Sequence, residues 1–310
     1  MPRSFAGVAE LAPVVRSALG GELVAVSRLA GGSKKGVYLL GLAGGGSAVA
    51  YIWTAAEDYW PAREGPQDVF TDASGPDLFR ASHDALAAAG VRTPRLLWAD
   101  GDVALVEEVR GGTLESLLAR EPAAPALAAL AELLATMAAA TSTAIGKVAR
   151  PDRSGRSCAR IVLDMALRDL AEAAARVPAI DAARSALTDR LRAFSVVGPR
   201  TGHALVHGEL GGDHVLLDDA GAPVLIDIEG LAYFDVEWEH AFLEMRFGAD
   251  AYEPLRPPGL DPDRMRFYRL ARHLSLVAGP LRLLDGDFPD REFMLEISAH
   301  HTDRVLSYLS

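Results

Sequence analysis

The sequence predicts an α+β fold, with a small antiparallel sheet in an N-terminal lobe and a larger helical C-terminal lobe. Short apolar segments separated by glycine turns fill most of the N-terminal third, as in strands joined by hairpins. Long amphipathic segments, several of them rich in alanine, fill most of the rest. We therefore expect an N-terminal lobe at residues 1–109 and a C-terminal lobe at residues 110–310, with a hinge near Arg110.

The N-terminal lobe is expected to begin with three strands joined by turns of small residues, Ala30-Gly31-Gly32-Ser33 and Gly44-Gly45-Gly46-Ser47. A helix should follow and end at Gly90, because glycine commonly stops a helix. A fourth strand should close the lobe. The expected strands are residues 22–29, 36–42, 48–53 and 103–109, and the expected helix is residues 77–89.

The C-terminal lobe is expected to be mainly helical, because apolar residues recur there with the period of an amphipathic helix. Three short strands interrupt the helices, and residues 219–222 form a plausible hairpin turn between the last two. The expected strands are residues 204–206, 215–218 and 224–228. The expected helices are residues 114–119, 125–144, 160–177, 181–197, 261–278 and 289–309.

The composition limits the classes of partner. The chain has 31 basic and 42 acidic residues, so its formal charge is −11. Nucleic acids and anionic membranes are bound mainly through Lys and Arg, so we expect neither as a partner. A cationic substrate is compatible with this charge, and acidity that serves solubility alone explains it as well.

The single cysteine, Cys158, excludes an internal disulfide and a thiolate metal cluster within one chain. The first ten residues lack the pattern of a secretion signal, and no apolar run is long enough to span a bilayer. We therefore expect a soluble cytoplasmic protein. The sequence does not indicate an oligomeric state.

The chemistry-bearing residues are concentrated in two neighbouring segments, residues 205–217 and 224–230. An apolar strand leads into a His-Gly-Glu turn, a glycine pair permits a tight loop, and a hairpin then presents two further acids. Carboxylates close together on a hairpin suit a hard cation such as Mg²⁺. The groups able to accept a proton or bind such a cation are Glu209, His214, Asp227 and Glu229.

These segments resemble the catalytic loop of aminoglycoside phosphotransferases and of related choline and macrolide kinases, which have a protein-kinase-like, two-lobed fold. The family pattern is H-G-D-x-x-x-x-N, followed by a strand that ends in a metal-binding Asp. His207-Gly208-Glu209 matches H-G-D, His214 takes the place of the Asn, and Asp227 takes the place of the metal-binding Asp. Downstream, Asp235 and Glu239 lie at the offsets of two further family acids.

The resemblance implies phosphoryl transfer from ATP, or GTP, with Mg²⁺ as cofactor. It makes Glu209, supported by His207, the candidate catalytic base, and it makes His214, Asp227 and Glu229 the candidate metal ligands. Two substitutions depart from the pattern. Glutamate is one methylene longer than aspartate, and imidazole is a softer ligand than an amide oxygen, so His214 is also a candidate for contact with phosphate or substrate.

The nucleotide half of the pattern is weaker. The family places its phosphate-covering loop where Gly32, Ser33, Lys34 and Lys35 lie, and it reads the adenine edge near residues 107–109, here Glu107 and Val109. The family lysine of the third strand is replaced by Tyr51, and the helix at residues 77–89 has no glutamate to pair with it. Lys34 or Lys35 could supply the missing charge, although each taken singly also fits a solvated loop lysine.

The resemblance also implies a small hydroxylated acceptor, such as an antibiotic or another secondary metabolite, bound over the C-terminal lobe. The acids Asp235, Glu237 and Glu239 are candidate acceptor contacts, although a solvated helix face would explain them as well. Two alternatives stay open. One is a pseudokinase-like nucleotide- or metabolite-binding protein without phosphoryl transfer, and the other is a phosphatase or nucleotidyl-transferring enzyme that uses the same acids.

Overall fold

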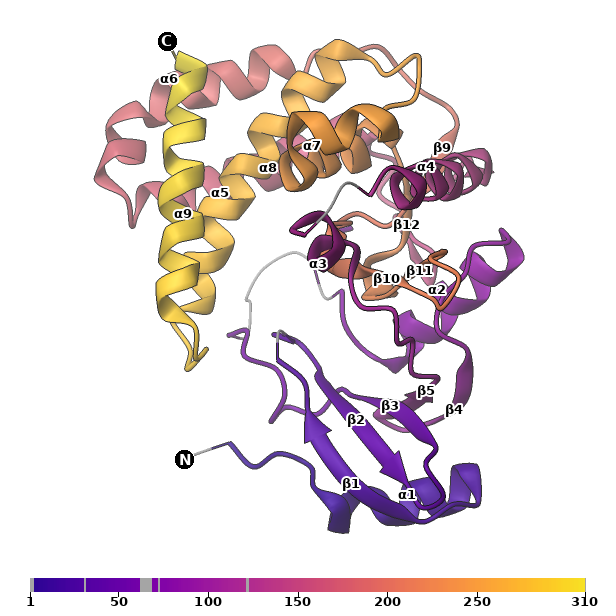
Figure 1. Ribbon diagram of the computed structural model, residues 1–310. Helices are drawn as coiled ribbons and strands as arrows, with labels where there is room; N and C mark the ends of the chain where they lie inside the picture. The colour runs from indigo at the N-terminus through magenta and orange to yellow at the C-terminus, as the bar shows by residue number, and fades with distance from the viewer. Residues whose placement is uncertain (1–2, 31, 62–68, 72, 121–122, 310) are drawn as a thin grey trace. The chain divides into compact units, whose positions relative to one another are not determined.

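In the computed structural model the chain forms two compact units (Figure 1). The structure describes residues 3–30, 32–61, 69–71, 73–120 and 123–309. The first unit comprises Met1–Trp60, Asp72–Ala126 and Gly212–Gly230, and the second comprises Pro61–Thr71, Leu127–Gly211 and Leu231–Ser310. The α+β fold is confirmed. The first unit also contains residues 110–126 and 212–230, so the compact units do not divide the chain at residue 109. A lobe boundary at that residue stays a prediction.

The first unit is built on an antiparallel sheet with the strand order β1-β2-β3-β5-β4. Helix α1 packs on β1 and β4, and its Leu11 and Val15 join the apolar core of the sheet (Figure 1). The strands are β1 (Leu23–Arg28), β2 (Gly36–Leu42), β3 (Ser47–Ile52), β4 (Leu96–Asp100) and β5 (Val103–Val106), and the helices are α1 (Val8–Leu19) and α2 (Pro76–Ala88).

Helix α1 and strand β4 were not anticipated from the sequence. The helix contains Pro13, which argues against a helix in a sequence reading, yet its ends are well defined. The side chain of Glu10 accepts a hydrogen bond from the Gly7 amide at 2.9 Å, and Gly20 ends the helix in the left-handed conformation at φ 67°. Local capping and burial against the sheet therefore outweigh the proline.

The first unit also includes a hairpin from the later part of the chain. Its strands are β10 (Val215–Leu217) and β11 (Pro223–Leu225), flanked by the short helices η1 (Gly212–His214) and η2 (Ile228–Gly230). Helix α3 (Leu114–Leu118) packs on η1 and β10, and α2 packs on η2. Gly111 allows the segment before α3 to approach β10 closely, because a Cβ there would lie 2.3 Å from the carbonyl oxygen of Leu217.

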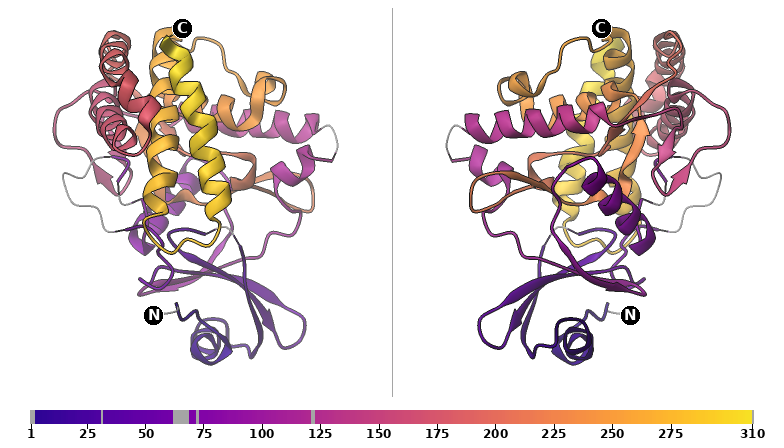
Figure 2. Two further views of the ribbon diagram at one scale, coloured as in Figure 1. Left: turned by 90° about the vertical axis from the view of Figure 1, so that its left-hand side faces the viewer. Right: turned by 90° about the vertical axis from the view of Figure 1, so that its right-hand side faces the viewer.

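The second unit combines a sheet of short strands in the order β6-β9-β12-β7-β8 with a layer of helices. Helices α5, α7 and α9 all pack on α8, and α8 and α9 run side by side in Figure 2. The strands are β6 (Thr141–Ser142), β7 (Gly146–Lys147), β8 (Arg150–Pro151), β9 (His203–Val206) and β12 (Ala232–Phe234). The helices are α4 (Ala124–Ala139), α5 (Cys158–Ala174), α6 (Pro178–Phe194), α7 (Val236–Tyr252), α8 (Pro262–Leu283) and α9 (Arg291–Leu306).

Most predicted elements have somewhat different ends in the structure, and two of these differences have a clear cause. The helix predicted to reach residue 144 ends at Ala139, because residues 141–142 pair with β9 instead. The strand predicted for residues 224–228 ends at Leu225, because Asp227 adopts φ 59°, which is incompatible with a strand.

No helix in the described ranges has the length and apolar character needed to cross a membrane.

Candidate active site

Asp227 occupies an unusual backbone conformation directly after β11. Its φ of 59° lies in the left-handed region, which costs free energy for any residue with a Cβ. The carboxylate is 46% exposed, so this conformation presents it to the surroundings of the first unit rather than to its core. Such strain is common where a side chain has to be aimed at a ligand.

Lys35, the residue before β2, reaches Asp227. Its Nζ lies 2.6 Å from Asp227 Oδ1 and 2.6 Å from Glu229 Oε1, although the lysine itself is only 7% exposed. Burial would lower the pKa of this ammonium, but the two carboxylates outweigh that effect and raise the pKa well above its ordinary value. Lys35 is therefore a fixed positive charge on the two acids of the hairpin.

The interpretation of Lys35 as a solvated loop lysine was wrong. Its Nζ lies 5.1 Å from the centre of the Tyr51 ring, so the ammonium is beside the residue that replaces the strand lysine. Burial raises the pKa of Tyr51 to about 12, so the ring is a neutral phenol at physiological pH. The sheet thus carries a cation at this point although its third strand has no lysine.

Gly36 helps to place Lys35. A Cβ at Gly36 would lie 2.4 Å from Cδ of the buried Glu57, so only glycine fits beside that side chain. Glu57 is fixed in turn by Arg28, whose Nη2 donates to it at 2.8 Å, and by the hydroxyl of Tyr38. Sequence reasoning missed Glu57, because it follows β3 in a turn without any motif.

Glu229 is buried, at 3% exposure, and its two carboxylate oxygens differ in their surroundings. Oε1 accepts hydrogen bonds from Lys35 Nζ and from Trp53 Nε1, the latter at 3.1 Å. Oε2 has no hydrogen-bond partner among the described residues. An unsatisfied buried carboxylate oxygen is costly, so this atom is a suitable ligand for a cation.

His214 lies on the same side of the hairpin as Asp227. Its Nε2 is 3.7 Å from Asp227 Oδ2 and 3.7 Å from Asp213 Oδ2. These distances exceed hydrogen-bond length, and a group that bridges imidazole and carboxylate would fit between them. The structure therefore brings the three predicted metal ligands together in the first unit. The carboxylate oxygens Asp227 Oδ2 and Glu229 Oε2, the latter unsatisfied, suit a hard divalent cation better than the imidazole does.

The loop predicted to cover phosphates is held by its own neighbours, and Gly31 lies outside the described residues. Ser33 accepts hydrogen bonds from the Tyr59 amide at 2.8 Å and from Trp60 Nε1 at 3.0 Å. Lys34 Nζ lies 5.3 Å from the Trp60 ring centre. Gly32 has no room for a side chain, because a Cβ would lie 2.3 Å from the Lys35 carbonyl oxygen. Nucleotide binding by this loop stays a prediction.

The residues predicted to read the nucleobase follow β5, which ends at Val106. The amide of Glu107 donates to the carbonyl oxygen of Arg95 at 3.0 Å, and the amide of Arg95 donates to Glu107 Oε1 at 3.1 Å. Val109 is half-buried. The main chain at Glu107 is thus tied to the neighbouring strand, and a role in base recognition stays a prediction.

The candidate base, Glu209, belongs to the second unit, where its carboxylate is exposed while His207 is buried. The preceding Gly208 has φ 93°, a conformation that favours glycine. Its amide donates to Glu239 Oε2 at 2.8 Å, and its carbonyl oxygen accepts from the guanidinium of Arg272. The turn that carries Glu209 is therefore fixed by hydrogen bonds to both the amide and the carbonyl group of Gly208.

Arg272 on α8 was missed in the sequence, because a single arginine in an amphipathic helix has no distinguishing pattern. Its guanidinium carbon lies 3.6 Å from the ring centre of Trp238 and 4.7 Å from that of Phe242. Burial lowers the pKa of Arg272 to about 10, opposed by the negative charges of Glu209 and Glu239. Arg272 is therefore a buried cation held against the backbone of the turn at Gly208.

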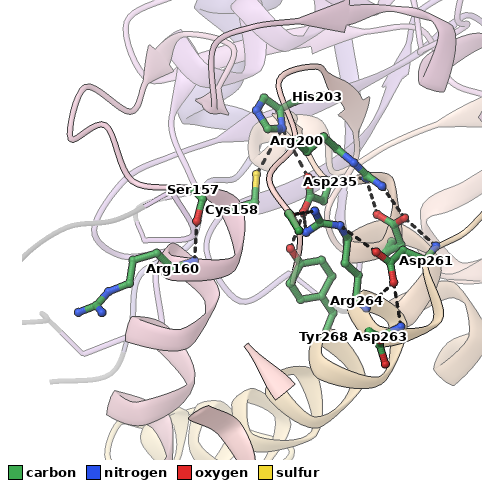
Figure 3. A network of polar contacts seen from close by, with 12 residues as sticks. Ser157, Cys158, Arg160, Arg200, His203, Asp235, Asp261, Asp263, Arg264 and Tyr268 are labelled. Carbon is green, nitrogen blue, oxygen red and sulfur yellow. Dashed lines mark hydrogen bonds and ion pairs between the residues drawn. The ribbon is translucent and has the colours of Figure 1, made fainter. Parts of the chain in front are cut away.

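The predicted acceptor contacts are buried rather than solvated. Glu237 is 0% exposed and accepts from both Nη atoms of Arg200, at 2.6 and 2.9 Å, and Asp235 is 1% exposed and bonded to Arg264 and Tyr268 (Figure 3). Glu239 supports Gly208. The interpretation as a solvated helix face was wrong for these three residues. Direct contact with an acceptor stays a prediction, against which the burial of Asp235 and Glu237 argues.

Comparison with known proteins places these observations in a family. A family model described as "Phosphotransferase enzyme family" matches residues 26–268, which include every candidate site residue. No curated protein matches the sequence.

Solved structures with the same fold cover nearly the whole chain. Choline kinase LicA from Streptococcus pneumoniae is 13% identical, with a TM-score of 0.67 and coverage of 96% of this chain and 98% of that one. A thermostable mutant of aminoglycoside phosphotransferase APH(4)-Ia is 18% identical, with a TM-score of 0.64 and coverage of 94% and 98%. Spectinomycin phosphotransferase APH(9)-Ia, solved with ADP and spectinomycin, is 13% identical, with a TM-score of 0.63 and coverage of 97% and 95%. At these identities the likeness shows the fold, which confirms the kinase-like architecture expected from the sequence.

Proposed function

Since the chain belongs to the phosphotransferase enzyme family, we propose that it transfers the γ-phosphoryl group of ATP, or of GTP, to a hydroxyl group of a small molecule. The observation that carries the proposal is the arrangement of Lys35, Asp227 and Glu229. A buried lysine touches two acids of one hairpin, and one of those acids is held in a strained conformation. Fixed charges of this kind are what phosphoryl transfer requires, because its catalysis depends on positioning and electrostatic stabilisation.

The groups of the first unit would bind the nucleotide phosphates. Asp227 Oδ2 and Glu229 Oε2, with His214 beside them, would hold Mg²⁺, which when bound neutralises charge on the phosphate oxygens. Lys35 would exchange its contact with Asp227 for a phosphate oxygen, the group that a lysine of the third strand contacts in other kinases. The proposed nucleotide contacts at Gly32, Ser33, Lys34, Tyr51, Glu107 and Val109 rest on their place in the chain.

Glu209 would act on the acceptor. Its carboxylate would take the proton of the acceptor hydroxyl as that oxygen forms a bond to the γ-phosphorus. The bond between the γ-phosphorus and the bridging oxygen would break, and ADP would leave with the bridging oxygen. Arg272 and Glu239 would keep Gly208, and hence Glu209, in place for this step.

We propose a cationic hydroxylated acceptor, such as an aminated antibiotic or another secondary metabolite, so that the reaction would inactivate or mark that molecule. The formal charge of −11 favours a cation. Two of the structural neighbours are named for aminoglycoside and spectinomycin substrates and a third for choline, which supports this class without identifying the compound.

The test is a reaction of ATP, Mg²⁺ and purified protein with a panel of hydroxylated amines and antibiotics, followed by phosphorus-31 NMR and mass spectrometry. The proposal expects ADP and a singly phosphorylated acceptor, both absent with Asp227→Ala. Release of inorganic phosphate alone, or of pyrophosphate, would indicate a phosphatase or a nucleotidyl-transferring enzyme instead.

One observation favours the alternative of a nucleotide- or metabolite-binding protein without turnover. Lys35 neutralises both acids by direct contact, so an ammonium already occupies one side of the proposed metal site. If the protein binds ATP in a thermal-shift assay but leaves it intact with every acceptor, this alternative replaces the enzyme.

A further inference from the structure

A second cluster of reactive side chains lies in the second unit and takes no part in the proposed reaction. It consists of Cys158, the first residue of α5, His203, the first residue of β9, and Asp235, which precedes α7 (Figure 3). All three are buried, at 2%, 4% and 1% exposure. Their potential ligand atoms, a thiol sulfur, an imidazole nitrogen and a carboxylate oxygen, all lie within 4.8 Å of one another.

Two of the three separations match a tetrahedral metal centre. Cys158 Sγ lies 3.5 Å from His203 Nδ1, and the same nitrogen lies 3.5 Å from Asp235 Oδ1. Zinc binds thiolate sulfur at about 2.3 Å and imidazole nitrogen or carboxylate oxygen at about 2.0–2.2 Å. At a tetrahedral angle these bond lengths put neighbouring ligand atoms about 3.3–3.6 Å apart.

Two other interpretations of the cluster fit less well. In a nucleophilic triad the histidine uses one nitrogen for the cysteine and the other for the acid, whereas here Nδ1 faces both. Burial also raises the pKa of the Cys158 thiol, which opposes a free nucleophilic thiolate. A plain hydrogen-bond cluster leaves Asp235 Oδ1 without a hydrogen bond from any residue that the structure describes, although this oxygen is buried and faces the histidine.

The other carboxylate oxygen of Asp235, Oδ2, accepts two hydrogen bonds. Asp235 Oδ2 accepts from the Tyr268 hydroxyl at 2.5 Å and from Arg264 Nη1 at 3.1 Å (Figure 3). These contacts orient the carboxylate so that Oδ1 alone faces Cys158 and His203, as outer hydrogen bonds commonly orient a metal-binding carboxylate. The nearby cation Arg200 makes its short hydrogen bonds to Glu237, and its Nη1 lies farther from Asp235 Oδ1, at 3.7 Å, so it offsets the charge of that oxygen only in part.

A cavity of about 380 Å³ adjoins the cluster and is lined by all three of its residues. The cavity has room for a water molecule as fourth ligand and gives a path for a metal ion. An anion is a weaker candidate for this cavity, because its arginines are already paired. Arg160 pairs with Asp164, Arg200 with Glu237, and Arg264 with Asp235.

We propose that Cys158, His203 and Asp235 form a site for Zn²⁺ or a similar soft divalent cation, separate from the Mg²⁺-dependent chemistry of the hairpin. Sulfur and imidazole ligands select such ions against Mg²⁺, which prefers oxygen. The site would link α5 to β9, the strand that leads directly into His207 and Glu209, and to the start of α7. Metal binding would therefore stabilise the second unit around the catalytic loop.

The test uses the full-length protein without a histidine tag, stripped of metal and titrated with Co²⁺ as a spectroscopic substitute for Zn²⁺. We expect one equivalent of Co²⁺ to give the near-ultraviolet absorption of a cobalt–thiolate bond and the intense visible bands of a tetrahedral centre. Zn²⁺ should then abolish both. Because the metal displaces the thiol proton, apparent affinity should rise with pH, by up to about tenfold per unit.

The variants assign the ligands. Cys158→Ser should lose the thiolate absorption, and His203→Gln should weaken Co²⁺ binding at least tenfold. His300→Gln, which changes an exposed histidine outside the cluster, should titrate as the unaltered protein does. If the unaltered protein, folded by circular dichroism, gives no thiolate band and does not compete with a chromophoric chelator for Zn²⁺, the proposal is wrong whether or not the variants fold. A thiolate band that persists in Cys158→Ser would also overturn it.

Discussion

Lys35 Nζ and Asp227 Oδ1 lie 2.6 Å apart although 192 residues separate them in the sequence. The contact joins the residue before β2 to the segment that follows the β10–β11 hairpin, within the first unit. It supplies the positive charge that Tyr51 cannot supply from β3. The hairpin acids thus have a cationic partner from the residue before β2, and not from the third strand as in the family pattern.

Loss of Lys35 should abolish most of the activity. We expect Lys35→Met to reduce kcat/KM for ATP at least a hundredfold, because a preorganised charge on a phosphate is worth about 3 kcal/mol or more. Lys34→Met is the matched comparison, since Lys34 is half-buried and its Nζ lies 5.3 Å from the Trp60 ring centre. It should lose tenfold or less. Steady-state kinetics with the acceptor found in the panel measures both, and equal losses would contradict the assignment.

The strained backbone of Asp227 should appear as a stability difference between two inactive variants. Asp227→Gly and Asp227→Val both remove the carboxylate, but only valine is forced to keep a β-branched side chain at φ 59°. We expect Asp227→Val to have a free energy of unfolding about 2 kcal/mol lower than Asp227→Gly. Urea denaturation of the two proteins measures this difference. Equal stabilities would show that the residue is not held in this conformation.

Arg272 should act on the rate through the main chain of the catalytic loop. Arg272→Met keeps the packing on Trp238 but removes the hydrogen bond to the Gly208 carbonyl oxygen. We expect kcat to fall about a hundredfold, the effect of a displacement of about 1 Å at a reacting group, with little change in KM for ATP. Arg269→Met on the same helix, where Arg269 pairs with Glu244 at 3.2 Å, serves as control and should retain kcat within about threefold. A parallel loss in both variants would point to destabilisation of the helix instead.

The buried His240 should make the protein sensitive to acid. Burial lowers its pKa to about 4, and its Nδ1 lies 3.2 Å from the Tyr252 hydroxyl. The unfolded chain takes up this proton near pH 6.5, so the contribution of His240 to stability is complete above that pH and is lost as the pH falls to about 4. The loss should be on the order of 3 kcal/mol, at about 1.4 kcal/mol per pH unit. His240→Gln should remove this one contribution and so make the pH dependence of the unfolding free energy less steep over this range, while the buried His273 and His301, whose pKa values burial also lowers, keep theirs. An unchanged slope would contradict the assignment.

Much of the first unit could be predicted from local sequence. Strands β1, β2 and β3 followed from apolar runs bounded by glycine turns, because a hairpin depends on contacts close in sequence. Helix α1 and strand β4 were missed, since both depend on packing against that sheet. The burial of Asp235 and Glu237 was missed for the same reason. Their arginine partners, Arg264 and Arg200, are distant in the sequence.

By itself the sequence determined the division into a strand-rich N-terminal part and a helix-rich C-terminal part, and it determined the spacing from His207 to Asp227 by which the chain resembles its family, because motif spacing is a local property of the sequence. The tertiary structure alone decided that Lys35 contacts the hairpin acids and that Arg272 holds the backbone of the turn at Gly208. It also decided which acids are buried. It also assembled Cys158, His203 and Asp235 from the starts of three separate elements. Such contacts depend on where the chain returns in space, and no local pattern of residues records that position.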